Sequence, residues 1–411
     1  MPNLSSRLVF PIMRMYLLAL NPTDSVTEGF LPAARTLGLE VTVLTDQPAA
    51  HRARYPGTEV LECDVRDFRA VIALISARRP PDAVFTNSDH LQTQAALAAE
   101  YFALPAKDWR AALRTKDKAL LRRHLAAAGA DRVFSLEIPG RTPPAEVLAT
   151  TGEPPFPCVV KPREGVASED VVMAGTAGEL LARCEEIRAR RPGAALVVEE
   201  FLEGELYTLE TLGDGRTRHV LGGFRTELSP APYFIEERLR FVPAHPPDVV
   251  SRIVSQLDAL GVGFGSCHTE FVVGPDGRAR IIEVNYRAIG DQCDLLLAEL
   301  LGIPLFEHVL RTHLGEPLPA DLGARTDGAA LLDYPYARHP GTLTAAPGPA
   351  DLTFGDVRLT YRPLRETGER HDLYHTNRDI LGVVRATGRD QGSVDTAVRD
   401  FLAAQQWEIT P

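Results

Sequence analysis

Residues 267–287 constrain the fold of this 411-residue chain more than any other stretch. Two runs of alternating apolar and polar side chains flank a Pro-Asp-Gly sequence, and an Asp-Gly pair between such runs is typical of a β-hairpin. If Asp276 and Gly277 form a two-residue loop, counting outward from the loop places Glu270 directly opposite Glu283. We therefore predict an antiparallel hairpin whose register is set by this loop.

Successive side chains of a strand point to opposite faces, so the hairpin has one polar and one apolar face. On the polar face lie His268 opposite Asn285, Glu270 opposite Glu283, and Arg287. On the apolar face lie Phe271, Val273, Ile282 and Val284. We expect the apolar face to pack on a core and the polar face to line a site.

The polar face suggests a metal site. Opposed Cβ atoms on such a hairpin are about 5 Å apart, and two carboxylates held that close repel unless a proton or cation lies between them. With Asn285 beside Glu270 and Glu283, the expected occupant is Mg²⁺, or Mn²⁺, which takes oxygen ligands and is often shared with nucleotide phosphates. The alternative is a solvated face, because a three-residue bulged loop would put the glutamates on opposite faces. The spacing of these residues alone does not decide between a metal site and a solvated face.

Charge and composition exclude several classes of partner. A net charge of −11 argues against binding to nucleic acid or to an anionic membrane. No apolar run approaches the roughly 20 residues of a membrane span, and residues 1–12 are expected to be an irregular leader rather than a signal peptide. The 5 cysteines are scattered without a CxxC motif, which is typical of reduced cytoplasmic thiols. We expect a cytoplasmic protein with small-molecule partners, for which a homo-oligomer is compatible with the sequence.

The first third of the chain alternates strands with helices. Strands are expected at 15–20, 41–45, 60–63 and 83–86, and helices ending near 38 and at 68–78 and 91–102. This order predicts a Rossmann-like parallel sheet with helices on both faces. No G-x-G-x-x-G follows the first strand, which argues against a dinucleotide-dependent dehydrogenase.

Two later segments have features of a nucleotide site. After a helix expected over 113–128 and a Pro/Gly-rich boundary at 139–157, an apolar strand ends at Lys161 and enters a loop of small and polar residues. Such loops offer backbone N–H groups to phosphates, although a strand-end lysine is more often solvated. A further β-rich run emerges at Glu199 and Glu200, where a connector can present its backbone to adenine and a carboxylate to ribose; an acidic hairpin loop is the alternative.

The order of these pieces resembles the ATP-grasp family over roughly residues 13–315. The matching residues are Lys118, Lys161, Glu199-Glu200-Phe201-Leu202, His268-Thr-Glu270 and Glu283-x-Asn285-x-Arg287. The His-Thr-Glu-Phe spelling is closer to L-amino-acid ligases than to D-alanine–D-alanine ligases or biotin carboxylase. The segments beginning at Arg362 and His375 are similar to the C-terminal module of ATP-grasp ligases from siderophore biosynthesis.

The resemblance implies a role for each matching residue. Lys118 and Lys161 would contact ATP phosphates, and Glu199 with the Phe201–Leu202 backbone would hold adenine. Glu270, Glu283 and Asn285 would bind Mg²⁺, and Arg287 would stabilise the transferred phosphoryl group. The sequence departs from the family at Leu206, where a ribose-binding glutamate is usual, so Glu203 or Glu205 would take that role. The phosphate loop, 163–169, is also poor in glycine.

These expectations give a fold of α/β and α+β parts. We expect a Rossmann-like domain at 13–110, an ATP-grasp domain at 111–315 with a mobile lid at 139–203, and a small C-terminal α+β module at 316–411. The expected reaction is ADP-forming ligation, in which a carboxylic acid is activated as an acyl phosphate and joined to an amine. The substrates would be amino acids or siderophore and natural-product building blocks.

Four residues are candidates for contacts with these substrates. Arg225 and Arg287 suit the placement of the carboxylate by bidentate pairing. Glu236 can hold the incoming ammonium, and His268 can assist its deprotonation. Alternatively, Arg225 and Glu236 are surface residues and His268 only orients Glu270.

Two other functions are compatible with the same fold. An ATP-dependent carboxylase is disfavoured because the chain has no Met-Lys-Met biotin-carrier sequence. A non-catalytic ATP-binding protein is disfavoured because each expected metal-ligand position is filled.

Overall fold

The N-terminal part of the chain is a parallel α/β unit. The computed structural model describes residues 13–323 and 327–411, and the expected leader at 1–12 lies outside them. The sheet order is β3-β2-β1-β4, and all three strand pairs are parallel, which confirms the Rossmann-like expectation. Its strands are β1 (Arg14–Leu18), β2 (Glu40–Thr45), β3 (Glu59–Glu62) and β4 (Ala83–Phe85). Its helices are η1 (Ser25–Phe30), α1 (Leu31–Thr36), α2 (Pro48–Arg54), α3 (Phe68–Ser76), η2 (Asp89–Leu91) and α4 (Gln92–Tyr101).

Two helices connect this unit to the rest of the molecule. The single helix predicted over 113–128 is wrong, because the structure has α5 (Trp109–Lys116) and α6 (Lys118–Ala127). Between them Asp117 is extended, and its Oδ1 accepts the N–H groups of Ala119 and Leu120 at 3.0 Å each. A side-chain acceptor at this position satisfies free amides of the new helix. The cap therefore makes Lys118 the first residue of α6.

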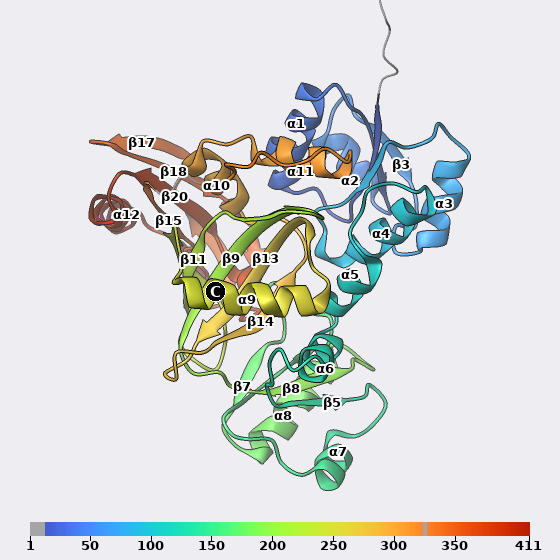
Figure 1. The fold of residues 1–411 in the computed structure, drawn as a ribbon. Coiled ribbons are helices and arrows are strands. Elements are labelled where there is room, and N and C mark those ends of the chain that lie inside the picture. The colour runs from blue at the N-terminus through green and yellow to red at the C-terminus, as the bar shows by residue number, and fades with distance from the viewer. Residues whose placement is uncertain (1–12, 324–326) are drawn as a thin grey trace, which may run out of the picture.

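A second lobe has its own sheet, of order β5-β8-β6-β7 (Figure 1). Its elements are β5 (Ser135–Ile138), α7 (Pro144–Thr151), β6 (Cys158–Pro162), β7 (Val172–Ala174), α8 (Ala177–Arg190) and β8 (Leu196–Glu200). α8 packs on the sheet through Leu180, Cys184 and Ile187, which are fully buried. We call this lobe, residues 135–200, the lid; its movement and the expected boundaries of 139–203 stay predictions.

The third part is a large antiparallel sheet of order β14-β13-β9-β11-β12-β15-β20-β18-β17, in which β10 also pairs with β9. Its first strands are β9 (Glu205–Asp214), β10 (Arg218–Val220), β11 (Gly223–Leu228), β12 (Glu236–Val242), β13 (Phe264–Val273) and β14 (Ala279–Asn285). A short break separates β10 from β11. Gly222, at φ +95°, lies in the break between them.

The C-terminal residues continue this same sheet rather than packing on it as a separate layer. β12 pairs with β15, and the sheet extends through β20, β18 and β17. These elements are β15 (Ala329–Asp333), β17 (Ala350–Phe354), β18 (Val357–Pro363), β20 (Gly382–Gly388) and α12 (Gln391–Ala404). A small sheet of β16 (Gly341–Ala345), β19 (Arg370–His371) and β21 (Glu408–Thr410) accompanies η3 (Asn377–Asp379).

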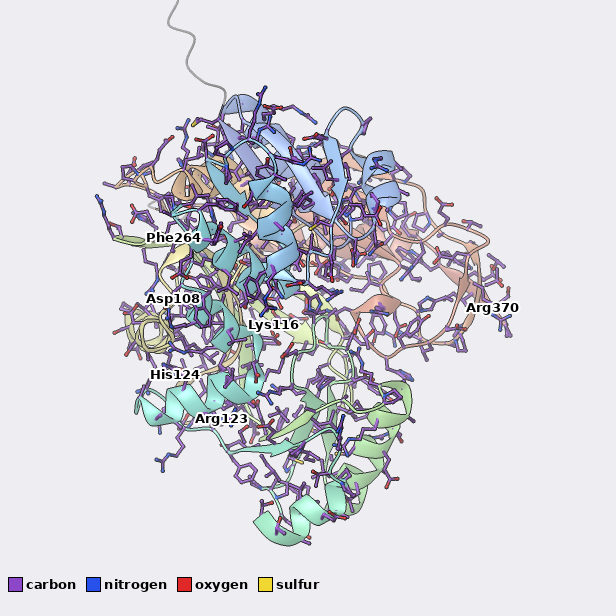
Figure 2. The ribbon with its side chains drawn as sticks, turned by 90° about the vertical axis from the view of Figure 1, so that its right-hand side faces the viewer. Asp108, Lys116, Arg123, His124, Phe264 and Arg370 are labelled. Atoms are coloured by element: carbon purple, nitrogen blue, oxygen red, sulfur yellow. The ribbon has the colours of Figure 1, made fainter. Side chains whose placement is uncertain are left out.

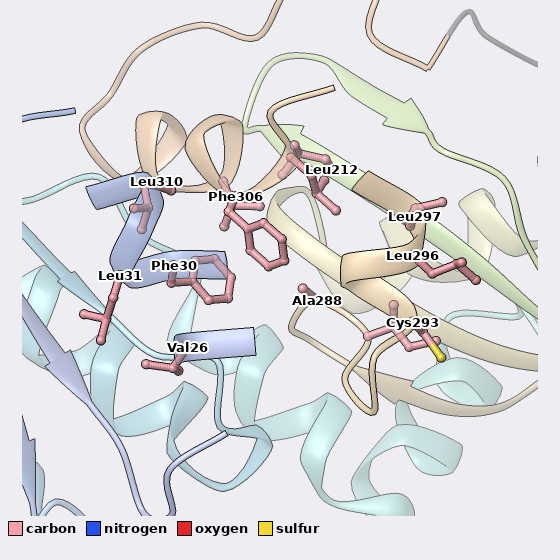
Figure 3. Close-up of a cluster of buried hydrophobic side chains, with 14 of the residues drawn as sticks. Val26, Phe30, Leu31, Leu212, Ala288, Cys293, Leu296, Leu297, Phe306 and Leu310 are labelled. Atoms are coloured by element: carbon pink, nitrogen blue, oxygen red, sulfur yellow. The ribbon is translucent and has the colours of Figure 1, made fainter. Parts of the chain in front are cut away.

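A shared apolar core fixes the N-terminal unit against the large sheet (Figure 3). The ring of Phe30 lies 4.7 Å from that of Phe85 and 4.9 Å from that of Phe306, measured between centroids. Phe306 belongs to α11 (Leu305–His313), which follows α10 (Cys293–Leu301), and α9 (Pro247–Leu260) covers β14 (Figure 1). A Cβ at Gly29 would lie 2.3 Å from the Phe306 ring, so this close approach requires glycine. The contact joins η1 of the N-terminal unit to α11.

In the part of the chain that the structure describes, no helix has the length and apolar character needed to cross a membrane.

Candidate active site

One cavity of about 920 Å³ lies where all parts of the molecule meet. Its walls come from the loops after β1 and β4, from the lid, from β9, β11, β13 and β14, and from η3. Figure 2 shows α5 and α6 between the N-terminal sheet and the lid, with Lys116 and Arg123 labelled on them. The cavity is therefore built from segments far apart in the sequence. Its volume lies within the range of small-molecule and cofactor sites.

The hairpin residues predicted to face one another do so. β13 pairs with β14 so that Glu270 lies opposite Glu283 and His268 lies opposite Asn285, and all four residues line the cavity. Arg287 follows β14 and lines it as well. The predicted pairing of the glutamates is confirmed.

The loop that was expected to set this pairing is different. Val273 pairs with Ala279, and the N–H of Gly274 donates to the carbonyl of Arg278 at 3.1 Å. The loop therefore has three residues, 275–277, and ends at Gly277 with φ +70°. That register alone would put the glutamates on opposite faces. A bulge at Ile282 adds one residue to β14 and restores the register at Glu283. Ile282 consequently lines the cavity, and its predicted place on the apolar face is wrong.

Arg122 of α6 satisfies the backbone of this bulge. Its guanidinium donates to the carbonyls of Ile281 at 2.6 Å and Ile282 at 3.3 Å. The same group donates to both carboxylate oxygens of Glu199 at 2.8 and 2.9 Å, and the side chains are only 4% and 5% exposed. Arg122 was not predicted as a site residue, because a helical arginine carries no local sign of a buried partner 77 residues away.

Glu199 is thereby the partner of two cations. Lys161 Nζ lies 2.8 Å from Glu199 Oε2. Burial raises the pKa of Glu199, but Arg122 and Lys161 outweigh this effect and lower the pKa to about 2. Burial lowers the pKa of Lys161. Glu199 lines the cavity, and its carboxylate is engaged by Arg122 and Lys161. A contact between Glu199 and adenine stays a prediction.

The connector after β8 retains backbone groups at the cavity wall. Glu200 Oε1 accepts the N–H of Phe134 at 2.6 Å, and the N–H of Phe201 donates to the carbonyl of Pro157 at 3.1 Å. Glu200, Phe201 and Leu202 all line the cavity. The Phe201 amide is thus engaged within the protein, which leaves Leu202 as the candidate donor to adenine.

Three predicted residues lie outside the cavity lining. Arg225 Nη2 pairs with Glu205 Oε1 at 2.6 Å, and the two side chains are 41% and 56% exposed. Their neighbours Thr226 and Leu206 line the cavity, so strand alternation turns Arg225 and Glu205 away. Glu203 is also exposed. The carboxylate-binding role of Arg225 and the ribose role of Glu203 or Glu205 are therefore not supported by their positions.

Lys118 is the nearest cation to the opposed glutamates. Its Nζ lies 2.9 Å from Glu283 Oε1 and 3.1 Å from the carbonyl of Gly165 in the lid. Burial lowers the pKa of Lys118, but Glu283 outweighs this effect and raises the pKa above its usual value. The Asp117 cap at the start of α6 brings this ammonium to the site.

His268 lies between two carboxylates. Its Nδ1 is 2.7 Å from Glu210 Oε1, and its Nε2 is 3.4 Å from Glu270 Oε1. Burial lowers the pKa of His268, but Glu210 and Glu270 together raise it to about 10. The predicted role of His268 in deprotonating an amine stays a prediction. The alternative, that His268 orients Glu270, agrees with the contacts.

Polar lining residues gather around Glu236, including Asp291 and Asn377, and we call this part of the cavity its polar end. Glu236 lines it, and burial, Glu270 and Asp291 raise the pKa of Glu236 to about 7. Its backbone N–H donates to Asn377 Oδ1 at 3.0 Å. Arg287 Nη1 donates to the carbonyl of the next residue, Ala288, at 2.8 Å, so the guanidinium is held close to its own backbone.

The N-terminal unit also contributes residues that the sequence analysis missed. Asp24, Asn87 and Asp89 line the cavity from the loops after β1 and β4. Asn87 Oδ1 accepts the N–H of Ala288 at 3.1 Å, and Lys116 pairs with Asp89. Ligands of parallel sheets commonly bind beyond the carboxyl ends of the strands, which was the signal available in the sequence.

The donor set suits a hard divalent cation. The described residues contain no group of three or more His, Cys, Asp and Glu that could hold a metal. The candidates are Glu270, Glu283 and Asn285, which the hairpin brings together. Asn285 Nδ2 lies 3.4 Å from Glu270 Oε1, which brings amide and carboxylate together. Two carboxylates and an amide oxygen match Mg²⁺ or Mn²⁺ rather than a softer metal.

Comparison with known proteins agrees with this geometry. Residues 154–295 match the ATP-grasp domain family. An uncharacterised protein of Sinorhizobium fredii, y4rH, is 28% identical over 430 residues, which cover 97% of this chain and 84% of that protein. A phosphoribosylamine–glycine ligase of Phenylobacterium zucineum is 27% identical over 261 residues, which cover 57% of each chain.

Solved structures share the fold over the whole chain. The L-amino acid ligase from Bacillus licheniformis has a TM-score of 0.78 at 21% identity, covering 97% of this chain and 99% of that one. The phosphoribosylglycinamide synthetase from Anaerococcus prevotii has a TM-score of 0.71 at 14% identity, covering 97% and 100%. The chain therefore has the fold of these ATP-grasp structures, and residues 154–295 match the ATP-grasp domain, as the motifs predict.

Proposed function

We propose that the protein is an ATP-dependent, ADP-forming ligase that joins a carboxylic acid to an amine. The observation that carries the proposal is the opposition of two glutamates in a cavity that also holds an amide and three cationic side chains. These residues are Glu270, Glu283, Asn285, Lys118, Lys161 and Arg287. Such a set concentrates positive charge beside a carboxylate pair. It suits the binding and transfer of a phosphoryl group.

The lid end of the cavity would bind ATP. Lys161 and Lys118 face the cavity from β6 and α6, and each has a carboxylate partner within 2.9 Å in the absence of nucleotide. Phosphate oxygens would join these ion pairs, and Leu202 would offer its backbone to adenine. The Arg122–Glu199 pair would hold Lys161 in place without touching the substrate.

Glu270, Glu283 and Asn285 would hold Mg²⁺ or Mn²⁺, which when bound neutralises the β- and γ-phosphates. His268 and Lys118 each contact one of the two carboxylates, so the protein itself limits their repulsion. His268 would thereby fix the orientation of Glu270.

In the first step, an oxygen of the substrate carboxylate attacks the γ-phosphorus and ADP leaves. Arg287 lies in the cavity two residues after Asn285 and would offset the charge of the transferred group. The product is an acyl phosphate. Because Arg225 is turned away, Arg287 is the remaining candidate of the two arginines for placing the carboxylate.

In the second step, an amine attacks the acyl carbon and orthophosphate leaves. Glu236 lines the polar end of the cavity and would hold the incoming ammonium. A carboxylate can also accept the proton that the nitrogen loses as the amide bond forms. The likeness in fold to an L-amino acid ligase supports amino acids, or related natural-product and siderophore building blocks, as substrates.

An amine-dependent ADP-release screen tests this proposal. The purified protein would be given Mg-ATP with pairs drawn from amino acids, hydroxy acids and polycarboxylic acids, and ADP, phosphate and amide would be measured. We expect ADP release that requires both an acid and an amine. A Glu205→Gln variant serves as the control, because Glu205 lies outside the cavity lining. ADP release that needs bicarbonate but no amine would favour a carboxylase, and no release with any pair would favour a binding protein.

A further inference from the structure

The C-terminal part of the chain supplies one wall of the active site. A short segment that we call the closing loop, residues 375–378, follows the small C-terminal sheet and includes the first two residues of η3. Asn377 of this loop lines the cavity together with residues of the lid and of β12. The reaction as proposed above uses no residue of this loop.

Asn377 connects the lid to the polar end of the cavity. Its backbone N–H donates to the carbonyl of Ala167 in the lid at 3.4 Å. Its side-chain Oδ1 accepts the backbone N–H of Glu236 at 3.0 Å. Ala167 and Glu236 both line the cavity. We call the connection from β6 to β7, residues 163–171, the lid loop. Asn377 thus links the lid loop to the backbone of Glu236, the proposed amine-binding residue.

An ion pair adds to this contact. Arg378 of the closing loop pairs with Glu169 of the lid loop, and the Glu169 side chain is only 12% exposed. Glu169 also pairs with Arg191 at the end of α8, within the lid. Loss of Arg378 would therefore break the contact between the two loops while leaving Glu169 with a partner.

A stacked pair of rings forms a third contact on the same side. Tyr233, in the connection from β11 to β12, lies parallel to His375, with ring centroids 4.1 Å apart and planes inclined by 1°. Tyr233 also packs against the apolar core of the lid. The N–H of Met173 in β7 donates to the carbonyl of Pro232 at 3.0 Å. The connection therefore lies between the lid and the closing loop.

The lid loop has a backbone that needs such support. Ala167, Ser168 and Asp170 have φ values of 55°, 55° and 57°, in the left-handed region that side chains other than glycine rarely adopt. Residues in such conformations persist where their surroundings determine them, and they cluster at ligand clamps. Ala167 is the residue that the closing loop holds.

We propose that the closing loop is the docking surface for the lid, and that Asn377 and Arg378 are positioning residues that keep the cavity shut during the reaction. This inference rests on the proposed function. An acyl phosphate exposed to water is hydrolysed to the acid and orthophosphate, with the loss of one ATP per event. A lid docked on the C-terminal part excludes water until the amine attacks, and it sets the space available beside Glu236.

The test compares Arg378→Ala and Asn377→Ala with a matched control, Arg190→Ala. Arg190 pairs with Asp170 of the same lid loop at 2.6 Å, but this pair lies within the lid. The first measurement is the ratio of phosphate released to amide formed. Loss of the Arg378–Glu169 ion pair should raise this ratio by roughly fivefold, because one partly exposed ion pair contributes up to about 1 kcal/mol to lid docking. Arg378→Lys should restore it in part, and Arg190→Ala should leave it unchanged.

The second measurement needs no turnover. Amide exchange at residues 163–171 is followed with and without Mg-ADP, alongside the melting temperature of each variant. We expect Arg378→Ala to lose protection in this segment while its melting temperature stays that of Arg190→Ala. If Arg378→Ala had the amide protection of wild type at residues 163–171 and the wild-type ratio of phosphate to amide, the docking proposal would be overturned. Absence of any amide product would reject the proposed function instead, and the exchange result would still decide whether the lid docks on the closing loop.

Discussion

Arg122 makes four hydrogen bonds that methionine cannot make. Replacing Arg122 with methionine should therefore both destabilise the protein and damage the active site. Two of these bonds go to the carboxylate of Glu199, and two go to the carbonyls at the bulge of β14. Methionine keeps the length and apolar character of the stem but removes every donor. The bulge is what brings Glu283 opposite Glu270, so its support bears directly on the site.

The magnitude follows from the burial of these groups. Removing one partner of a buried ion pair costs about 3–5 kcal/mol, and Lys161 remains as a partner for Glu199, which favours the lower end. Two carbonyls that lose their donor add about 1 kcal/mol each. We therefore expect Arg122→Met to lower the free energy of unfolding by about 4–5 kcal/mol. Glu199→Gln, which leaves two buried cations, should lose a comparable amount.

Urea unfolding followed by circular dichroism measures both changes and that of the double variant. Residues in one buried network are not additive, so the double variant should lose at least about 2 kcal/mol less than the sum of the two single changes. Arg110→Met is the control, because Arg110 lies 3.8 Å from Asp108 with a 57% exposed side chain. The control should lie within about 0.5 kcal/mol of wild type. An Arg122→Met protein within about 1 kcal/mol of wild type, or strict additivity, would refute this reasoning.

Three further predictions concern the site and the core. Glu283→Gln should abolish ADP release at saturating Mg²⁺ while thermal unfolding without nucleotide stays near wild type, since it removes a ligand charge at constant volume; retained ADP release would exclude Glu283 as a ligand. Mg-nucleotide should slow amide exchange at residues 163–169 of the wild-type lid, and unchanged exchange would indicate a rigid site. Burial lowers the pKa of His313 to about 3, and neither ring nitrogen has a hydrogen-bond partner among the described residues. The unfolded state therefore binds the extra proton as the pH falls below about 6.5, and stability should drop by about 2 kcal/mol between pH 6.5 and 5. His313→Phe, which can keep the edge contacts with Phe85 and Phe264, should remove that loss in urea titrations at the two pH values, and an unchanged acid dependence would contradict the assignment.

The hairpin shows how a correct prediction can have an incomplete basis. Glu270 faces Glu283 as expected, yet the loop has three residues and the bulge at Ile282 corrects the register. Loop chemistry is local and can be read from an Asp-Gly pair. The bulge depends on a guanidinium from α6 that satisfies its carbonyls, and that is a tertiary contact.

Local sequence patterns were sufficient to predict the N-terminal parallel sheet. A local pattern also marked the break between α5 and α6, although it was not used in the prediction. Asp117 before Lys118 is a favourable N-cap, so the division into α5 and α6 was readable from capping rules. The continuous apolar periodicity of the segment concealed it. The consequence is functional, because the break sets the direction of the Lys118 side chain.

Partners across the fold could not be predicted. Glu199 and Glu205 are both acidic residues near the end of β8, but one is buried against Arg122 and the other is exposed beside Arg225. The sequence around them does not distinguish the two environments. Asn377 likewise has no motif, and its place in the cavity follows from the pairing of distant strands.

The central claim is that a carboxylate takes the γ-phosphoryl group of ATP before an amine attacks. Isotope transfer tests it most directly, with an acid whose carboxylate carries ¹⁸O and an amine from a pair that supports turnover. The opposed glutamates and Arg287 lie together in one cavity with Lys118 and Lys161, so we expect ADP and orthophosphate in equal amounts with one ¹⁸O in the phosphate. Label in AMP, with pyrophosphate as the co-product, would contradict the account.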